Sequence, residues 1–215
     1  QRHGALLRSY ASALGGSAGR LVISLLYFVS LANSLSISDF GLFASASAAG
    51  IVLSRIISLG FVSPLYRVAT VKPQLLGVYY AGYLAAVLIS LPLAALAGWA
   101  VFRVFFSGLV TASAFAAIIF TEALLWRGLE TIVIVNNGLN RFGRAAMLVV
   151  AGTALRAGAA FLFALSVDHS LAAWVRFYVA ANALSLAVAL FFYLPRRRLR
   201  FRPALYARRA MDALW

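Results

Sequence analysis

Seven charged residues lie inside stretches that are otherwise apolar enough to cross a membrane. They are the arginines Arg20, Arg55, Arg127, Arg156 and Arg176 and the glutamates Glu122 and Glu130. A charge at the centre of a bilayer costs about 2.5–3.5 kcal/mol even on insertion scales, so charges kept there line a polar cavity or pair with one another. Because the positive charges outnumber the negative ones, the sequence predicts a cavity that receives an anionic ligand.

The rest of the composition places these charges in a membrane protein. The chain has 215 residues, of which 64% are hydrophobic and 11% charged, and a water-soluble domain of this composition would expose too much apolar surface. Residues 73–102 carry no formal charge, and about 20 apolar residues suffice to cross a hydrocarbon core of ~30 Å. At least one transmembrane helix is therefore expected, and membrane lipids are expected partners.

The basic residues are placed for a membrane rather than for nucleic acid. A net charge of +14 would suggest nucleic acid in a soluble protein. Here seven of the nineteen basic residues lie within residues 196–209, and most others lie at the ends of apolar segments. The sequence predicts no nucleic-acid partner.

Residue types needed for common cofactors and catalytic sites are scarce. There is no cysteine, and the two histidines, His3 and His169, lie at opposite ends of the chain, which argues against a disulfide framework and a catalytic zinc site. Asp168, His169 and Ser170 form a loop cluster with nothing to arrange them as a relay. We expect no cofactor, no metal and no enzymatic activity.

Prolines, glycines and charges divide the chain into six apolar segments. They cover roughly residues 12–36, 40–65, 75–102, 106–136, 144–167 and 170–194. Because no segment alternates as a transmembrane barrel requires, the prediction is an all-α bundle of six membrane-spanning helices over residues 1–195. We expect Asp39 to cap the second helix, Pro64 to end it and Pro92 to kink the third.

The loop charges predict the orientation of this bundle. One set of helix ends carries thirteen basic residues, at positions 2, 8, 67, 72, 141, 144, 196, 197, 198, 200, 202, 208 and 209, whereas the opposite ends carry Arg103 alone. The positive-inside rule then places both termini in the cytoplasm. Residues 196–215 form a basic tail, which either links to a further lobe or rests on anionic lipid.

Helical spacing places several of the buried charges on polar faces. In the first segment Arg20 shares a face with Ser24, Tyr27 and Ser34. In the fourth, one broad arc holds Glu122, Arg127, Glu130 and Asn137. With the predicted orientation, most of these charges lie between the midplane and the cytoplasmic surface, which suits a cavity that captures a charged headgroup there.

Structural roles compete with ligand binding at most of these residues. Arg127 and Glu130 are three residues apart and form either a structural ion pair or part of the cavity. Glu122 either neutralises Arg156 across the bundle, the alternative we favour, or binds a proton or cation. Arg176 lies near the outer end of its segment, where its side chain reaches the interface.

Arg20 and Arg55 have the strongest expectation of a ligand-binding role, because neither segment contains an acidic residue. The small residues at positions 15–19 and 45–50 favour close helix packing instead.

One hairpin carries a family resemblance. Residues 36–44 read Ser-Ile-Ser-Asp-Phe-Gly-Leu-Phe-Ala, and the span that they open ends in Ser58-Leu59-Gly60-Phe61. This resembles the first hairpin of bacterial polysaccharide flippases of the Wzx type, in the multidrug, oligosaccharidyl-lipid and polysaccharide exporter superfamily. That hairpin commonly reads L-s-x-x-x-F/Y-G-x-F/Y, followed by a span ending in D-x-G. Ser58 stands here in place of the acidic residue.

The resemblance implies a fold and a function. Such transporters have two six-helix lobes around a central cavity, so this chain would be the N-terminal lobe and its tail would lead to a second one. They move undecaprenyl-diphosphate-linked oligosaccharide from the cytoplasmic to the periplasmic leaflet of the bacterial inner membrane by alternating access, alongside the polysaccharide assembly machinery. By this analogy Arg20 and Arg55 contact the diphosphate, and the substrate-binding set is Arg20, Tyr27, Arg55, Glu122, Arg127, Glu130 and Arg156.

Three other functions are alternatives to this one. A drug or small-cation exporter of the same superfamily would be expected to have an acidic cavity, whereas this one is basic. A membrane enzyme or accessory subunit acting on polyprenyl phosphates would need a carboxylate–histidine or paired acidic site near an interface. A scaffold in a larger membrane complex would use the buried charges for assembly.

Overall fold

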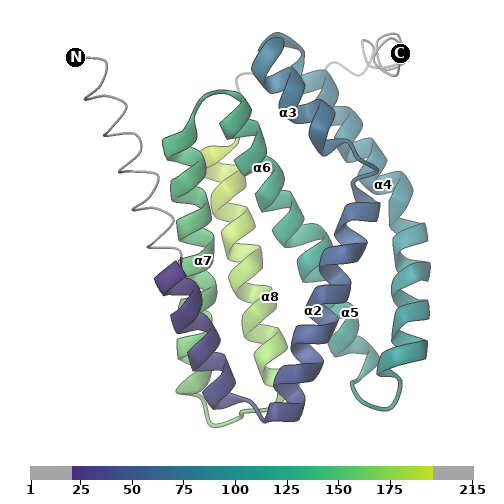
Figure 1. Cartoon of the computed structure of the whole chain (residues 1–215), viewed down its shortest axis with the longest axis vertical. Coiled ribbons are helices and arrows are strands. Elements are labelled where there is room, and N and C mark those ends of the chain that lie inside the picture. Colours follow the sequence, from purple (N-terminus) through teal and green to yellow (C-terminus); the bar gives the residue numbers. More distant parts are fainter. Residues whose placement is uncertain (1–20, 196–215) are drawn as a thin grey trace.

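The computed structural model describes residues 21–195, and all regular elements within that range are helices (Figure 1). They are the helix Leu21–Ser34, α2 (Ile37–Ile57), α3 (Val62–Val71), η1 (Pro73–Leu75), α4 (Leu76–Val101), η2 (Phe102–Phe106), α5 (Ala112–Phe120), η3 (Thr121–Trp126), α6 (Arg127–Gly138), α7 (Phe142–Ala164), α8 (Leu171–Val188) and η4 (Ala189–Tyr193). The η1 segment is a 3-10 turn and the other η segments are π-helical. The predicted all-α class is confirmed for this part of the chain. Arg20 and the tail 196–215 lie outside it.

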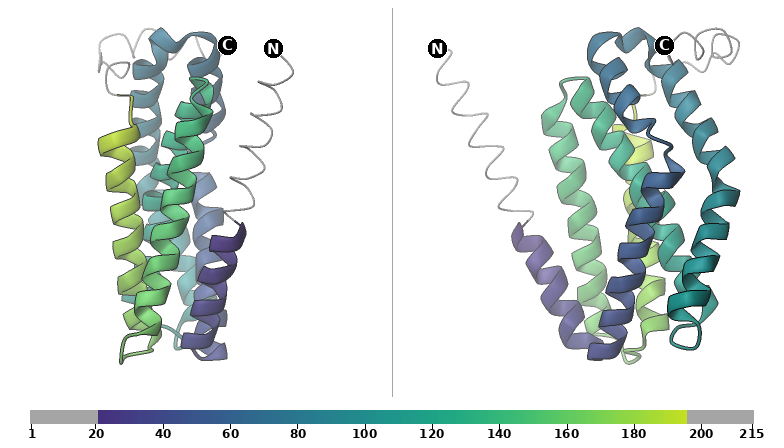
Figure 2. Two further views of the ribbon diagram at one scale, coloured as in Figure 1. Left: turned by 90° about the vertical axis from the view of Figure 1, so that its left-hand side faces the viewer. Right: turned by 45° about the vertical axis from the view of Figure 1, so that its right-hand side comes forward.

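The helices run along the long axis of the molecule and form one bundle. Figure 1 and the right-hand view of Figure 2 show α7 toward one side and α4 at the opposite edge, with α8, α6 and α2 between them. Some helices pack on their neighbours in sequence, as α7 does on α6 and α8. Others pack on more distant elements: α2 contacts α4, α5 and η3, and α3 contacts α6. The α4–α5 loop lies at the end opposite α3, at the bottom of Figure 1.

Within residues 21–195 four helical stretches are long and apolar enough to cross a membrane, which indicates a multi-pass membrane protein. They are Ile37–Ile57, Pro73–Phe106, Phe142–Ala164 and Leu171–Tyr193. They match the second, third, fifth and sixth predicted spans. The first predicted span is described only from Leu21, and the fourth consists of α5, η3 and α6. Six spans and the cytoplasmic location of both termini therefore remain predictions.

The second predicted span is broken rather than continuous. The α2 helix ends at Ile57, and Leu59 and Gly60 then adopt positive φ angles of 42° and 73° before α3 begins. The Ser90 hydroxyl on α4 donates a hydrogen bond of 2.7 Å to the carbonyl of Ile57 at this break. The prediction that Pro64 ends the span was wrong. Pro64 lies in the first turn of α3, where a missing N–H leaves no helical bond unmade.

The start of α2 also differs from the prediction, because Ser36 and not Asp39 caps it. The backbone N–H of Asp39 donates to Ser36 Oγ at 3.1 Å, and the Ser36 hydroxyl donates to the Asp39 carboxylate at 2.9 Å. Asp39 thus lies in the first turn, where its negative charge faces the positive end of the helix dipole.

The core is aromatic at its centre and closely packed at one glycine. Trp174 and Tyr178 on α8 are fully buried and contact Phe43 of α2 edge-on, at ring-centroid distances of 5.7 and 5.1 Å.

A Cβ atom on Gly50 of α2 would lie 2.8 Å from the Cβ of Glu122. Gly50 therefore lets α2 approach the helix that carries Glu122, as the cluster of small residues predicted.

Candidate functional site

Glu122 lies at the centre of a buried polar network. It sits on the π-helical turn η3 between α5 and α6, and only 3% of its surface is exposed. Its Oε1 atom accepts a hydrogen bond of 2.6 Å from Ser47 Oγ on α2 and a second from the Tyr178 hydroxyl on α8. A buried carboxylate with two donors on one oxygen joins three elements of the bundle.

Arg156 on α7 supplies the opposite charge, but it forms no hydrogen bond with the Glu122 carboxylate. Its Nη2 lies 3.9 Å from Glu122 Oε2 and makes no hydrogen bond within the described part of the chain. The guanidinium is held instead by Asn182, whose Oδ1 accepts from Nε at 2.8 Å, and by the ring of Trp126, 3.7 Å below Cζ. Close stacking of a guanidinium on indole is a favourable cation–π contact.

Arg127 and Glu130 form a second, separate network on α6. They are ion-paired, as their spacing predicted. Arg127 is 4% exposed, and its Nη2 also donates to Ser58 Oγ at 3.2 Å, at the break in the second predicted span. The Thr131 hydroxyl, one turn further along α6, bonds the Tyr83 hydroxyl of α4 at 3.0 Å. This network therefore ties α6 to α2 and α4.

Arg55 belongs to neither network. It lies in the last turn of α2 and is exposed, and it forms no ion pair with any residue of the range 21–195. Gly41, Ala44 and Ala48 are exposed on the same helix within about 40° of it at 100° per residue. This face of α2 thus carries a positive charge without an ion-pair partner in the described range, among both small side chains and the exposed Ile37 and Ile51.

Tyr27 lies beside the Glu122 network without bonding to it. Its ring packs against Trp174 at a centroid distance of 6.1 Å, and it is close enough to Arg156 and Glu122 to interact with both electrostatically. Arg20, which the sequence placed on the same face as Tyr27, is outside the described residues. The predicted site residues therefore separate into the network of Glu122, Arg156 and Tyr27, the pair Arg127–Glu130, and Arg55 alone.

Arg176 and the Asp168 loop have structural roles. The Arg176 side chain is 77% exposed, with its Nη2 3.9 Å from Asp168 Oδ2. Its reach to the membrane interface stays a prediction. The Ser170 side chain and backbone N–H donate to Asp168 and hold the pKa of that carboxyl below its usual value. Ser170 also caps α8, by accepting from the N–H of Ala173 at 3.2 Å.

The sequence reading missed the neutral partners of the buried charges. Ser47, Tyr178, Asn182 and Trp126 all contact Glu122 or Arg156, and Ser58 contacts Arg127. Isolated serines, asparagines and aromatic residues in apolar segments gave only a weak signal, because which helices face one another is not encoded in the period of a single helix. Within residues 21–195 no group of His, Cys, Asp or Glu is arranged to hold a metal ion.

Comparisons with family models, with curated proteins and with solved structures found no match to this chain.

Proposed function

We propose that this chain is a lobe of a membrane transporter that moves an anionic, lipid-linked saccharide between leaflets. The main observation in favour of an anionic substrate is the unpaired charge of Arg55. Four arginines lie within the apolar segments of residues 21–195, and three of them have carboxylate partners. Arg55 is the exception, which leaves its charge available to an anionic ligand.

The chemistry of arginine suits a phosphate ligand. Its planar guanidinium stays charged at any physiological pH and offers forked donors that match phosphate oxygens. In this proposal Arg55, together with Arg20, binds the diphosphate that links lipid to sugar.

The other charged residues then brace the lobe. Glu122 and Arg156 join η3, α7, α2 and α8, while Arg127 and Glu130 hold the break of the second span against α6. In this proposal the two networks keep the lobe rigid, and Arg55 is left free to bind the substrate. The saccharide, and the inner membrane as the location, rest on the resemblance of residues 36–44 to the polysaccharide flippases.

The proposal is tested by charge removal at the two arginines. Arg55→Ala and Arg20→Ala should each abolish export of surface polysaccharide in the host cell while leaving the amount of inserted protein unchanged. Arg55→Lys, which keeps the charge but loses the fork, should retain partial export. Arg176→Ala is the matched control, because that arginine faces the surface, and it should export normally. Normal export by both Arg55→Ala and Arg20→Ala would refute the assignment.

A further inference from the structure

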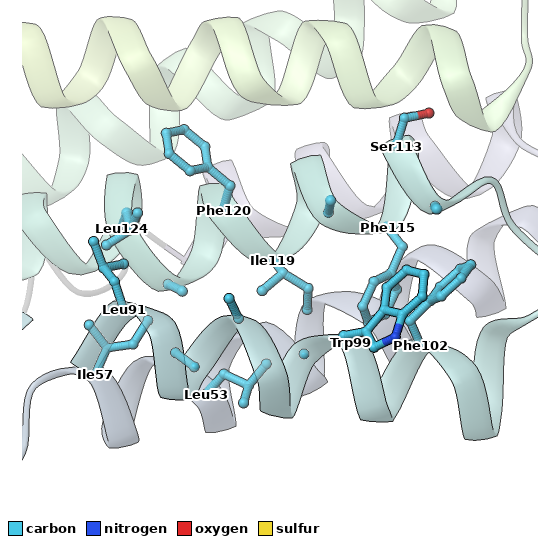
Figure 3. Close-up of a pocket in the computed structure, with 16 residues that line it drawn as sticks. Leu53, Ile57, Leu91, Trp99, Phe102, Ser113, Phe115, Ile119, Phe120 and Leu124 are labelled. Carbon is cyan, nitrogen blue, oxygen red and sulfur yellow. The ribbon is translucent and has the colours of Figure 1, made fainter. Parts of the chain in front are cut away.

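An apolar groove of about 520 Å³ lies between α4 and the α5–η3 helix, with α2 as its floor (Figure 3). Figure 3 shows Trp99, Phe102 and Phe115 gathered toward one end and Ile57, Leu91 and Leu124 toward the other. Leu53 in the floor and Gly98 at the base of the α4 wall are buried, whereas Ala95 and Ala116 on the two walls are exposed. The groove is therefore a furrow in the surface of the bundle and not an internal void.

The side chains that line the groove favour a hydrocarbon ligand. The volume of the groove falls in the range of about 300–1,000 Å³ usual for ligand sites, but no charged side chain lines it. The single hydroxyl, on Ser113, is bonded to Thr111 Oγ1 at 3.4 Å. The groove lies along the membrane-spanning stretches Ile37–Ile57 and Pro73–Phe106, at a depth where lipid chains are the solvent.

A basic residue stands at the mouth of the groove. The Cζ atom of Arg103 lies 5.9 Å from the ring centroid of Trp99, which itself lines the groove. Arg103 is exposed and has no carboxylate partner among residues 21–195. Tryptophan and arginine near the end of a spanning helix are typical of the headgroup level. Hydrocarbon in the groove and a positive charge at its mouth complement a lipid with an anionic head.

We propose that this groove binds one phospholipid, drawn from the leaflet at the α4–α5 end of the bundle. One acyl chain lies in the groove between Trp99 and Leu124, and the phosphate lies at Arg103. Free lipid is as apolar as the groove, so the preference arises from close packing of the chain and from the phosphate contact. The bound chain gives the walls of α4 and α5 the packing contacts that they do not make with each other. This site is independent of the proposed transport, because Leu53 and Ile57 are buried whereas Arg55 lies on an exposed face of α2.

The experiment uses the full 215-residue chain in phosphatidylcholine nanodiscs. The probe is phosphatidylglycerol with a photoreactive diazirine on one acyl chain, and labelled peptides are mapped by mass spectrometry. We expect labelling to saturate and to concentrate on the groove, at residues such as Ala116 and Ile119. Ala95→Trp fills the groove and should reduce that labelling to background. Ala100→Trp adds the same bulk to an exposed site on α4 outside the groove and should leave it unchanged.

The headgroup contact is tested separately. Arg103→Ala should weaken saturable binding about fivefold, as expected for one basic residue at a membrane surface, and Arg103→Lys should restore most of it. Diacylglycerol with the same diazirine chain, which lacks the phosphate, should label the groove as weakly as phosphatidylglycerol labels Arg103→Ala. If Ala95→Trp does not fold, Ala116→Trp fills the groove from the opposite wall. Three results would overturn the proposal. The first is labelling spread evenly over exposed positions such as Leu88 and Ile89, and the second is labelling that neither Ala95→Trp nor Ala116→Trp changes. The third is binding of phosphatidylglycerol by Arg103→Ala that equals binding by the unsubstituted chain.

Discussion

Replacing Glu122 by alanine and by glutamine separates the two ways in which this residue holds the bundle together. Alanine removes the acceptor for Ser47 and Tyr178 and also the charge opposite Arg156. Glutamine removes the charge alone, because its amide oxygen can still accept from both hydroxyls. The difference in the free energy of unfolding between the two variants therefore measures the contribution of the hydrogen bonds. The loss of unfolding free energy in Glu122→Gln measures the contribution of the ion pair.

The structure sets the size of both effects. Two unit charges about 4 Å apart attract by about 4 kcal/mol at an effective dielectric constant of 20, before the cost of desolvation. The Glu122–Arg156 separation is 3.9 Å, and Arg156 keeps Asn182 and Trp126 after the substitution, so we expect Glu122→Gln to cost about 1–2 kcal/mol. Interhelical hydrogen bonds in membranes average about 0.6 kcal/mol and reach about 1.7. Losing two of them in Glu122→Ala should add about 1–3 kcal/mol.

The assay is the free energy of unfolding in bilayer-like lipid discs, measured by steric trapping. A double-mutant cycle between Glu122→Gln and Arg156→Met isolates the charge interaction, which should be about 1–2 kcal/mol. Asn182→Ala serves as a comparison, because it frees Arg156 without touching Glu122.

Two results would refute this reasoning. A coupling energy near zero would mean that Arg156 does not act as the counter-ion of Glu122. Equal costs for Glu122→Ala and Glu122→Gln would mean that the bonds from Ser47 and Tyr178 contribute nothing. Either result would return Glu122 and Arg156 to the set of candidate substrate-binding residues.

The remaining predictions concern the backbone at two places on the second span. Gly50→Ala should lower the free energy of unfolding by about 1–3 kcal/mol, since the new Cβ would lie 2.8 Å from the Cβ of Glu122. Gly41→Ala is the control and should not be destabilising, because no atom lies within 4 Å of its new Cβ. Leu59→Gly should raise the free energy of unfolding by up to about 1 kcal/mol, because φ of 42° strains a leucine but not a glycine, whereas Gly60→Ala at φ of 73° should lower it. Chemical unfolding in detergent micelles measures both pairs, and a stabilising Gly50→Ala or a destabilising Leu59→Gly would contradict the corresponding contact or strain.

Much of the helical layout followed from composition, because long apolar runs have few alternatives in a membrane. The boundaries of α4, of α7 and of α8 together with η4 match the third, fifth and sixth predicted spans to within a few residues. The second span was predicted less well. Nothing in its hydropathy distinguishes a helix that passes through Ser58–Phe61 from one that breaks there, and Ser90 from α4 stabilises the break only once the helices are packed.

The sequence by itself determined that Arg127 and Glu130 pair, since three residues along a helix bring side chains together whatever surrounds them. It did not determine which charges are buried, because Glu122 and Arg127 are buried whereas Arg55 and Arg176 are exposed. Only the tertiary structure decided what the other charges face. Glu122 meets Ser47, 75 positions away, and Tyr178, 56 positions away, because α2 and α8 pack against η3. The same packing leaves Arg55 on an exposed face with no partner among residues 21–195. The helical period fixes the direction of a side chain relative to its own helix, but the packing of whole helices fixes what lies in that direction.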